Sequence, residues 1–100
     1  MSEIEELKRD ASQGDAEAQC LLGCHYSYGR HAEIPIDKTM AAHWLKKSAN
    51  QGFAQGQFQL ALLYLNGEGV GKDLKQCIQL MHMAAEQGHP GANQFMRDLD

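Results

Sequence analysis

The sequence predicts an all-α protein built from repeated pairs of short antiparallel helices, about six helices in total. A Gln-Gly pair occurs at 13–14, 51–52 and 87–88, with spacings of 38 and 36 residues. A fixed period of this length is the signature of a solenoid. Each interval contains one helical stretch, a turn with glycine and a second helical stretch. The chain therefore divides into a half-repeat, two full repeats and a capping half-repeat, which are 1–14, 15–52, 53–88 and 89–100.

Both helices of each repeat carry an apolar stripe. Offsets of four, one and three residues in the first helix place small and large side chains on one face. The small residues let a neighbouring helix approach closely, and leucine and tyrosine fill the remaining space. The stripes of the first helices are Ala18, Leu22, Gly23 and Tyr26, then Gly56, Leu60, Ala61 and Tyr64. Those of the second helices are Ala41, Trp44, Leu45, Ser48 and Ala49, then Cys77, Leu80, Met81, Ala84 and Ala85.

The residues at the predicted helix ends agree with this division. Asp37 and Asp73 stand where an N-cap side chain would accept from free backbone N–H groups. Gly52 and Gly88 stand where a helix closes in the left-handed conformation, which glycine adopts without steric cost. A glutamine amide bonded to a neighbouring turn would account for the residue that precedes each glycine.

Size, charge and the first residues limit the class of function. The length suits one small domain, and the net charge of −4 comes without any basic run. A nucleic-acid surface needs clustered Lys and Arg, and a membrane span needs a long apolar run, so we expect neither partner. The opening "MSEIEELKRD" lacks the apolar core of a signal peptide, and "EIEELKRDAS" is expected to dock as a helix through Ile4, Leu7 and Ala11. Three cysteines then favour a reduced, cytoplasmic protein.

At the level of motifs, the chain resembles the Sel1-like repeat family, relatives of the tetratricopeptide repeats. The family pattern resembles A-x-x-x-L-G-x-x-Y-x-x-G-x-G-V-x-x-D-x-x-K-A-x-x-W-x-x-K-A-A-x-Q-G. The stretch "GQFQLALLYLNGEGVGKDLKQCIQLMHMAAEQG" matches it closely, and "AQCLLGCHYSYG" with "DKTMAAHWLKKSANQG" matches it on either side of a divergent loop. The resemblance implies a right-handed α-solenoid that serves protein–protein interaction.

The chain departs from the family pattern at two places. From Gly29 to Asp37 the first loop advances eight residues, whereas Gly67 to Asp73 is six, and the Arg30–Ile36 segment lacks Gly-x-Gly-Val. Loops tolerate such insertions and often carry function, so both drift and a role remain open. The final half-repeat ends in the polar "MRDLD", which suits a helix that caps the last apolar face.

A helical-wheel projection predicts a partner-binding stripe on the first helices, which line the concave surface of such solenoids. The side opposite the buried stripe carries residues that the repeat core does not need. They are Leu21, Cys24 and Tyr28 in the first repeat, Gln59, Leu62 and Asn66 in the second, and Phe95 and Asp98 in the last half-repeat. A mostly apolar stripe of this kind would accept a helix or an extended peptide. Mutual packing of these side chains, or a self-association surface, are the alternatives.

Metal, cofactor and catalytic sites are not expected. Cys20 and Cys24 are four residues apart and precede His25, but they lie in mid-helix at positions that Phe58 and Leu62 fill in the next repeat. We therefore interpret them as small hydrophobic residues, and a disulfide between them has poor geometry. The histidines form no recognisable catalytic constellation. The "GEGVGKD" segment follows a helix rather than a strand, so its glycines indicate a repeat turn and not a phosphate loop.

The sequence therefore predicts a small, bacterial-type, non-catalytic adaptor or regulator that binds another protein. One alternative is an immunity or inhibitor protein that blocks a toxin or enzyme, since negative charge would speed encounter with a basic site. In that version the anchors are Leu21, Tyr28, Leu62 and Phe95, with Asp98 and Glu33 as rim charges. Another alternative is a structural unit that assembles with itself. A monomer or a weak homo-oligomer is expected.

Overall fold

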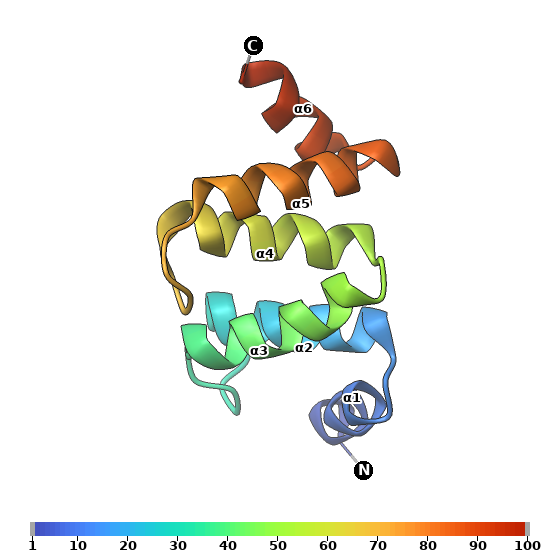
Figure 1. Cartoon of the computed structure of the whole chain (residues 1–100). Helices are drawn as coiled ribbons and strands as arrows, with labels where there is room; N and C mark the ends of the chain where they lie inside the picture. Colours follow the sequence, from blue (N-terminus) through green and yellow to red (C-terminus); the bar gives the residue numbers. More distant parts are fainter. Residues whose placement is uncertain (1, 100) are drawn as a thin grey trace.

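The computed structural model describes residues 2–99 as a stack of six α-helices without a β-strand. The helices are α1 (Glu3–Ser12), α2 (Ala16–Tyr28), α3 (Lys38–Asn50), α4 (Ala54–Asn66), α5 (Leu74–Glu86) and α6 (Pro90–Asp98). The stack is elongated, with extents of 47 × 24 × 18 Å, and α1 and α6 lie at its two ends (Figure 1). The predicted all-α solenoid is therefore confirmed.

Helix pairs within a repeat and between repeats alternate along the stack. The pairs α2–α3 and α4–α5 are the antiparallel hairpins of the two repeats, and α1, α3 and α5 each also pack against the helix that follows (Figure 1). The first helices α2 and α4 contact each other directly. We call α2, α4 and α6 the first-helix layer.

Side-chain caps define most helix starts. The carboxylates of Asp37 and Asp73 accept from the backbone N–H groups of Met40 and Gln76, each at 3.1 Å. Both predicted N-caps are thus confirmed. The turns after α3 and α5 contain Gly52 and Gly88 with φ of 82° and 85°, the left-handed region expected for them.

The core consists of three clusters that follow the stack. One joins α1 and α2, the next joins α2, α3 and α4, and the last joins α4, α5 and α6. Small residues bring the helices close: a Cβ on Gly56 would collide with the Ser48 side chain, and one on Gly23 would lie 2.7 Å from Leu45. Cys77 is fully buried, as predicted for a core position. Trp44 is half-buried and packs on the first cluster.

The second and third Gln-Gly turns are each tied to the Gln-Gly turn before them. The Gln51 amide Nε2 donates to the backbone oxygen of Gly14 at 2.8 Å and to Oε1 of Gln19 at 2.9 Å. Gln87 repeats the arrangement with the oxygen of Gly52 at 2.9 Å and Oε1 of Gln57 at 3.0 Å. The prediction of a glutamine bonded to a neighbouring turn is confirmed.

Helix α1 docks against α2 as predicted. Ile4 and Ala11 are buried against α2 and Leu7 is half-buried beside them. The Ser2 hydroxyl accepts from the Glu5 N–H and caps the helix. Met1 and Asp100, the outermost residues of the two predicted half-repeats, lie outside the described residues.

The divergent first loop keeps the apolar contact that the sequence pattern obscured. Ile34, three residues before the Asp37 cap, is 1% exposed and packs among α1 and α2. Val70 stands at the same distance before Asp73 and packs on the next cluster. The insertion therefore changes the outer part of the loop, where His31 and Ile34 form an isolated β-bridge. The buried apolar side chain before the Asp37 cap is kept.

His25 lies under this loop with its Nδ1 atom buried and without a hydrogen-bond partner. Its ring is 6.1 Å from that of His31, in an edge-on arrangement. Burial lowers the pKa of His25, and the nearby His31 and Arg30 lower it further. Leu63 occupies the equivalent position of the second repeat, so an uncharged side chain satisfies the packing there.

Replacing Gln87 by alanine should lower the free energy of unfolding by about 1–3 kcal/mol, because the Gln57 amide oxygen is buried and loses its donor. Urea unfolding followed by circular dichroism measures the change. The matched control is Gln79→Ala on the exposed face of α5, which should change stability by less than about 0.5 kcal/mol. Equal effects of the two substitutions would contradict a linking role for Gln87.

Acidification should destabilise the protein through His25. Because its pKa is lower in the folded state, the unfolded chain takes up the proton first, and stability falls as pH drops below the ordinary histidine value of about 6.5. His25→Leu, which copies the second repeat, should flatten the dependence of unfolding free energy on pH between about 7.5 and 5.5. An unchanged slope in this variant would assign the pH dependence to other groups.

Candidate partner-binding surface

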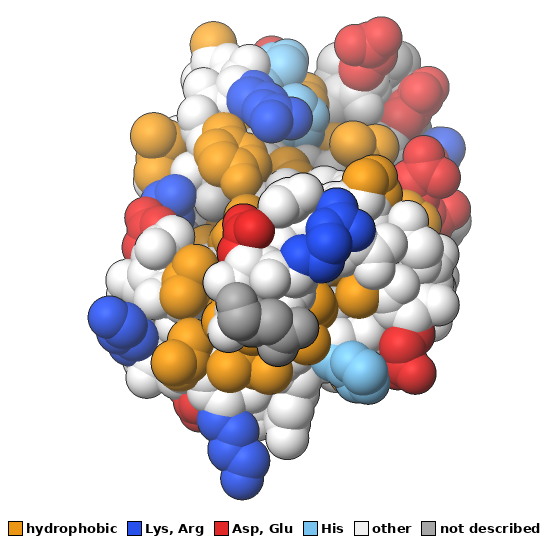
Figure 2. Space-filling view, turned by 90° about the horizontal axis from the view of Figure 1, so that it is seen from above, with side chains coloured by type: hydrophobic (Ala, Val, Ile, Leu, Met, Phe, Trp, Pro, Cys, Tyr) orange, Lys and Arg blue, Asp and Glu red, His pale blue; other side chains and the backbone are white. Residues whose placement is uncertain are grey.

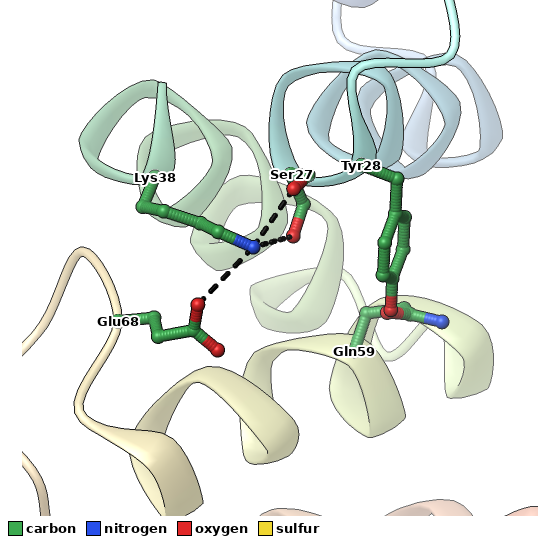
Figure 3. Close-up of polar contacts among 5 residues, drawn as sticks. All are labelled: Ser27, Tyr28, Lys38, Gln59 and Glu68. Carbon is green, nitrogen blue, oxygen red and sulfur yellow. Dashed lines mark hydrogen bonds and ion pairs between the residues drawn. The ribbon is translucent and has the colours of Figure 1, made fainter. Parts of the chain in front are cut away.

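Tyr28 and Gln59 form a polar contact across the first-helix layer. The Tyr28 hydroxyl, at the end of α2, donates to Oε1 of Gln59 on α4 at 2.6 Å. Figure 3 shows the ring reaching from one helix to the other. Tyr28 remains 44% exposed, so the bond fixes the direction of the ring without burying the residue. Burial of the hydroxyl raises the pKa of Tyr28, which keeps it a neutral donor.

Two basic side chains flank the Tyr28 ring. The Arg30 guanidinium lies 4.9 Å from the ring centroid and the Lys38 ammonium 5.7 Å, both within reach of a cation–π interaction. Lys38 donates to the backbone oxygen of Ser27 at 2.8 Å and to its hydroxyl at 3.2 Å, and its ammonium lies 3.3 Å from the Glu68 carboxylate (Figure 3). Tyr28 therefore lies beside two cations, of which Lys38 is held in place by Ser27 and paired with Glu68.

Glycine makes the Lys38–Glu68 contact possible. Gly69, with φ of 72°, approaches the backbone of Lys38 so closely that a Cβ there would collide with its carbonyl group. The turn of the second repeat thus rests on the start of α3, and Glu68 comes within reach of Lys38. Arg30, Lys38 and Glu68 were not predicted as site residues, because they belong to loops or helix starts and not to the stripe.

Leu21 opens onto a groove at the α1 end of the first-helix layer. It lies two turns before Tyr28 and is 46% exposed. The groove has a volume of about 290 Å³. Its lining consists of Leu7 and Asp10 from α1, and Asp15, Glu17, Ala18 and Leu21 from the α2 end. The acidic side chains of this lining were also missed, since a stripe drawn on one helix does not include residues of its neighbour.

The remaining predicted positions differ in exposure. Leu62 and Phe95 are half-buried against the cluster that joins α4, α5 and α6. Asn66 and Asp98 are exposed, and Asp98 accepts from the Gln94 amide at 2.8 Å on its own helix. The apolar stripe is therefore open at its α2 end and partly packed on itself at its α6 end.

The inclusion of Cys24 in the exposed stripe was wrong. Cys24 is 7% exposed and lies with Cys20, Leu45 and Leu60 in the cluster between α2, α3 and α4. The physical reason is that α4 packs directly beside α2 and covers this position. A hydrogen bond with Cys24, together with burial, raises the pKa of Cys20. All three cysteines are free and buried, in agreement with a core role.

Within residues 2–99, no group of three or more histidine, cysteine or acidic side chains is placed to hold a metal ion. No helix among these residues is long and apolar enough to span a bilayer.

Comparison with known proteins identifies the repeat. The Sel1 repeat matches residues 16–53 and 54–89. The mouse DAP3-binding cell death enhancer 1 is 36% identical over 93 residues, which is 93% of this chain and 18% of that protein. The chain thus spans about a fifth of that relative's length.

Solved structures have the same architecture. A Sel1 repeat protein from Oxalobacter formigenes superposes with a TM-score of 0.89 at 33% identity, covering 95% of this chain and 70% of that one. A protective antigen of uropathogenic Escherichia coli gives 0.84 at 38% identity, covering 94% of this chain and 20% of that one. Proteins with this repeat generally mediate protein–protein interactions, and the fold is typically a non-catalytic scaffold. From its repeats and its architecture, the chain belongs to the Sel1 repeat family.

Proposed function

We propose that this protein is a small adaptor or regulator that binds a partner protein on the concave face of its first-helix layer. The observation that supports this proposal is the ordered but exposed Tyr28 ring, tied to Gln59 and lying on the same helix as exposed Leu21. Tyrosine anchors are frequent among the residues that dominate binding energy. A ring already held in one orientation loses less conformational entropy when a partner packs on it.

Tyr28 is not explained by the needs of the repeat. Its equivalent in the second repeat is the exposed Asn66, so the repeat does not need an aromatic side chain at this position. Packing of α4 on α2 is already provided by buried Cys24 and Leu60. An aromatic side chain that the core does not require is therefore available for a partner.

The distribution of charge supports an inhibitor or immunity role as a narrower version of this function. The chain carries a net charge of −4, and the α1 end of the first-helix layer is acidic. Negative charge accelerates encounter with a basic target site. Asp98 and Glu33 would then be rim charges around the anchors Leu21, Tyr28, Leu62 and Phe95.

Self-assembly through the α6 end is a second candidate. Leu99 is 46% exposed, and Phe95 and Met96 are only half-buried. Figure 2, which looks down on this end, shows hydrophobic side chains gathered between charged ones. Light scattering over a concentration series tests this candidate: a mass that rises with concentration and falls again on Leu99→Glu supports it, whereas a constant monomer mass contradicts it.

Replacing Tyr28 by alanine should weaken partner binding by about 30-fold or more, equivalent to 2 kcal/mol or more, as expected for a central aromatic anchor. Affinity capture from the native host with the wild-type protein and the Tyr28→Ala, Leu21→Ala variant identifies the partner, and titration calorimetry then measures Kd. Circular dichroism checks that the variant is folded. Because Leu62 is half-buried, Leu62→Asp tests stability as well as binding and is the less selective change.

The matched control is Leu74→Ala, which removes an equally exposed leucine at the start of α5. It should leave partner affinity unchanged. Loss of the same partner with both variants, or retention with both, would exclude the first-helix layer as the binding face.

A further inference from the structure

We propose that the groove between α1 and α2 binds a basic amphipathic helix of the partner protein, laid beside α2 as another member of the first-helix layer. This inference rests on the proposed function and adds the chemistry of the partner. The groove is lined by Leu7, Ala18 and Leu21 and by three carboxylates.

The packing of α4 and α6 shows which element fills the space equivalent to this groove in the rest of the stack. Gln59 is the equivalent of Leu21 in the second repeat, and Tyr28 of α2 lies on it. One step further, Phe58 of α4 stacks on the His89 ring with centroids 4.4 Å apart, and Gln55 hydrogen-bonds to the same ring. Each of α4 and α6 is therefore covered on this side by the preceding first helix.

Over the described residues, α2 is the member of the layer that lacks such a neighbour. Leu21 of α2 is 46% exposed, whereas Gln59 at the equivalent position of α4 is hydrogen-bonded to Tyr28. The space beside it is bounded by two helices, as the equivalent spaces are. A helix with an aromatic or leucine side chain over Leu21 would repeat the contact that Tyr28 makes with Gln59.

The charge of the groove selects a basic helix. Asp10, Asp15 and Glu17 form its rim. The corresponding positions of the second repeat are Ser48, Phe53 and Gln55, none of which is charged, so the repeat itself does not require carboxylates there.

Helix capping explains only part of this rim. Asp15 caps α2 through the Ala18 N–H at 2.8 Å, and Glu17 lies in the first turn of that helix, where a negative charge is favourable. Asp10 lies in the last turn of α1, where the helix dipole disfavours a carboxylate. Its contact with Arg9 is long, at 3.5 Å, and exposed. A lysine or arginine of a bound helix would offset this unfavourable charge.

A second copy of this chain fits the groove less well. Helix α6, the member of the first-helix layer at the other end of the stack, carries Arg97 beside Asp98. The chain as a whole is negatively charged. The α1 surface next to the groove adds Glu3 and Glu6, both exposed. Like charges across such a contact are unfavourable, so head-to-tail stacking is an outcome of the test and not the proposal.

The test uses a stapled 15-residue helical peptide with tyrosine and leucine on one face and lysine on its flanks. Binding is measured by fluorescence anisotropy at low and high salt, and amide chemical shifts locate the peptide. We expect binding that weakens with salt, with shifts centred on Ala18 and Leu21. Two control peptides exchange lysine for glutamate, or the apolar residues for serine, and neither should bind.

Two variants of the protein test the two sides of the groove. The Asp10→Asn, Asp15→Asn, Glu17→Gln triple variant keeps a side-chain cap on α2 and should raise Kd for the lysine peptide on the order of tenfold, from three surface ion pairs. Leu21→Ala should weaken binding at both salt concentrations. The charge-matched control is Glu5→Gln, Asp73→Asn, Glu86→Gln, which changes three exposed carboxylates elsewhere and should bind as the wild type does.

The outcomes separate this inference from the proposed function. The basic-helix proposal is overturned by any of three results: the lysine peptide does not bind, it binds the control variant as weakly as the groove triple variant, or it changes the amide chemical shifts of residues away from the groove. The function proposal then still stands if Tyr28→Ala abolishes capture of the natural partner. If sedimentation instead shows head-to-tail dimers that the triple variant strengthens, the groove belongs to a second copy and the basic-helix proposal fails.

Discussion

The glutamine amide that joins each repeat to the one before it is the contact on which the layout of the stack depends. Gln51 and Gln87 each donate to a backbone oxygen in the preceding Gln-Gly turn and to a glutamine in the first helix of their own repeat. Apolar packing between helices is non-directional and tolerates small shifts. A hydrogen bond to a fixed carbonyl does not, because its strength depends on distance and angle. The two linked turns therefore set the register of the repeats.

That register determines what the first-helix layer offers to a partner. With α4 held beside α2, Tyr28 reaches Gln59 and its ring is ordered while exposed. The same packing buries Cys24, whereas Leu21 stays exposed in the groove between α1 and α2. An anchor and a neighbouring open groove thus follow from one arrangement of helices. A partner would have to extend along α2 from the groove, past Leu21, to contact the Tyr28 ring two turns further on as well.

The periodicity of single helices was enough to predict most of the fold. The caps at Asp37 and Asp73, the left-handed Gly52 and Gly88, and the buried Cys77 depend on local geometry or on one face of one helix. The candidate site was predicted only in part. Leu21 and Tyr28 are exposed as expected, but Cys24 was misplaced, because a helical wheel describes one helix and carries no information about the neighbour in the same layer.

The repeat, the family resemblance and the ends of the second helices could be predicted from the chain alone, because they follow from spacing, turn residues and apolar period. Which surface residues meet became known only from the packed helices. Three features join segments from different helices or turns: the pairing of Lys38 with Glu68, the burial of Ile34 in the core and the acidic groove. Such contacts depend on the distance between elements in space, and that distance is set by how small residues such as Gly56 and Gly69 let backbones approach.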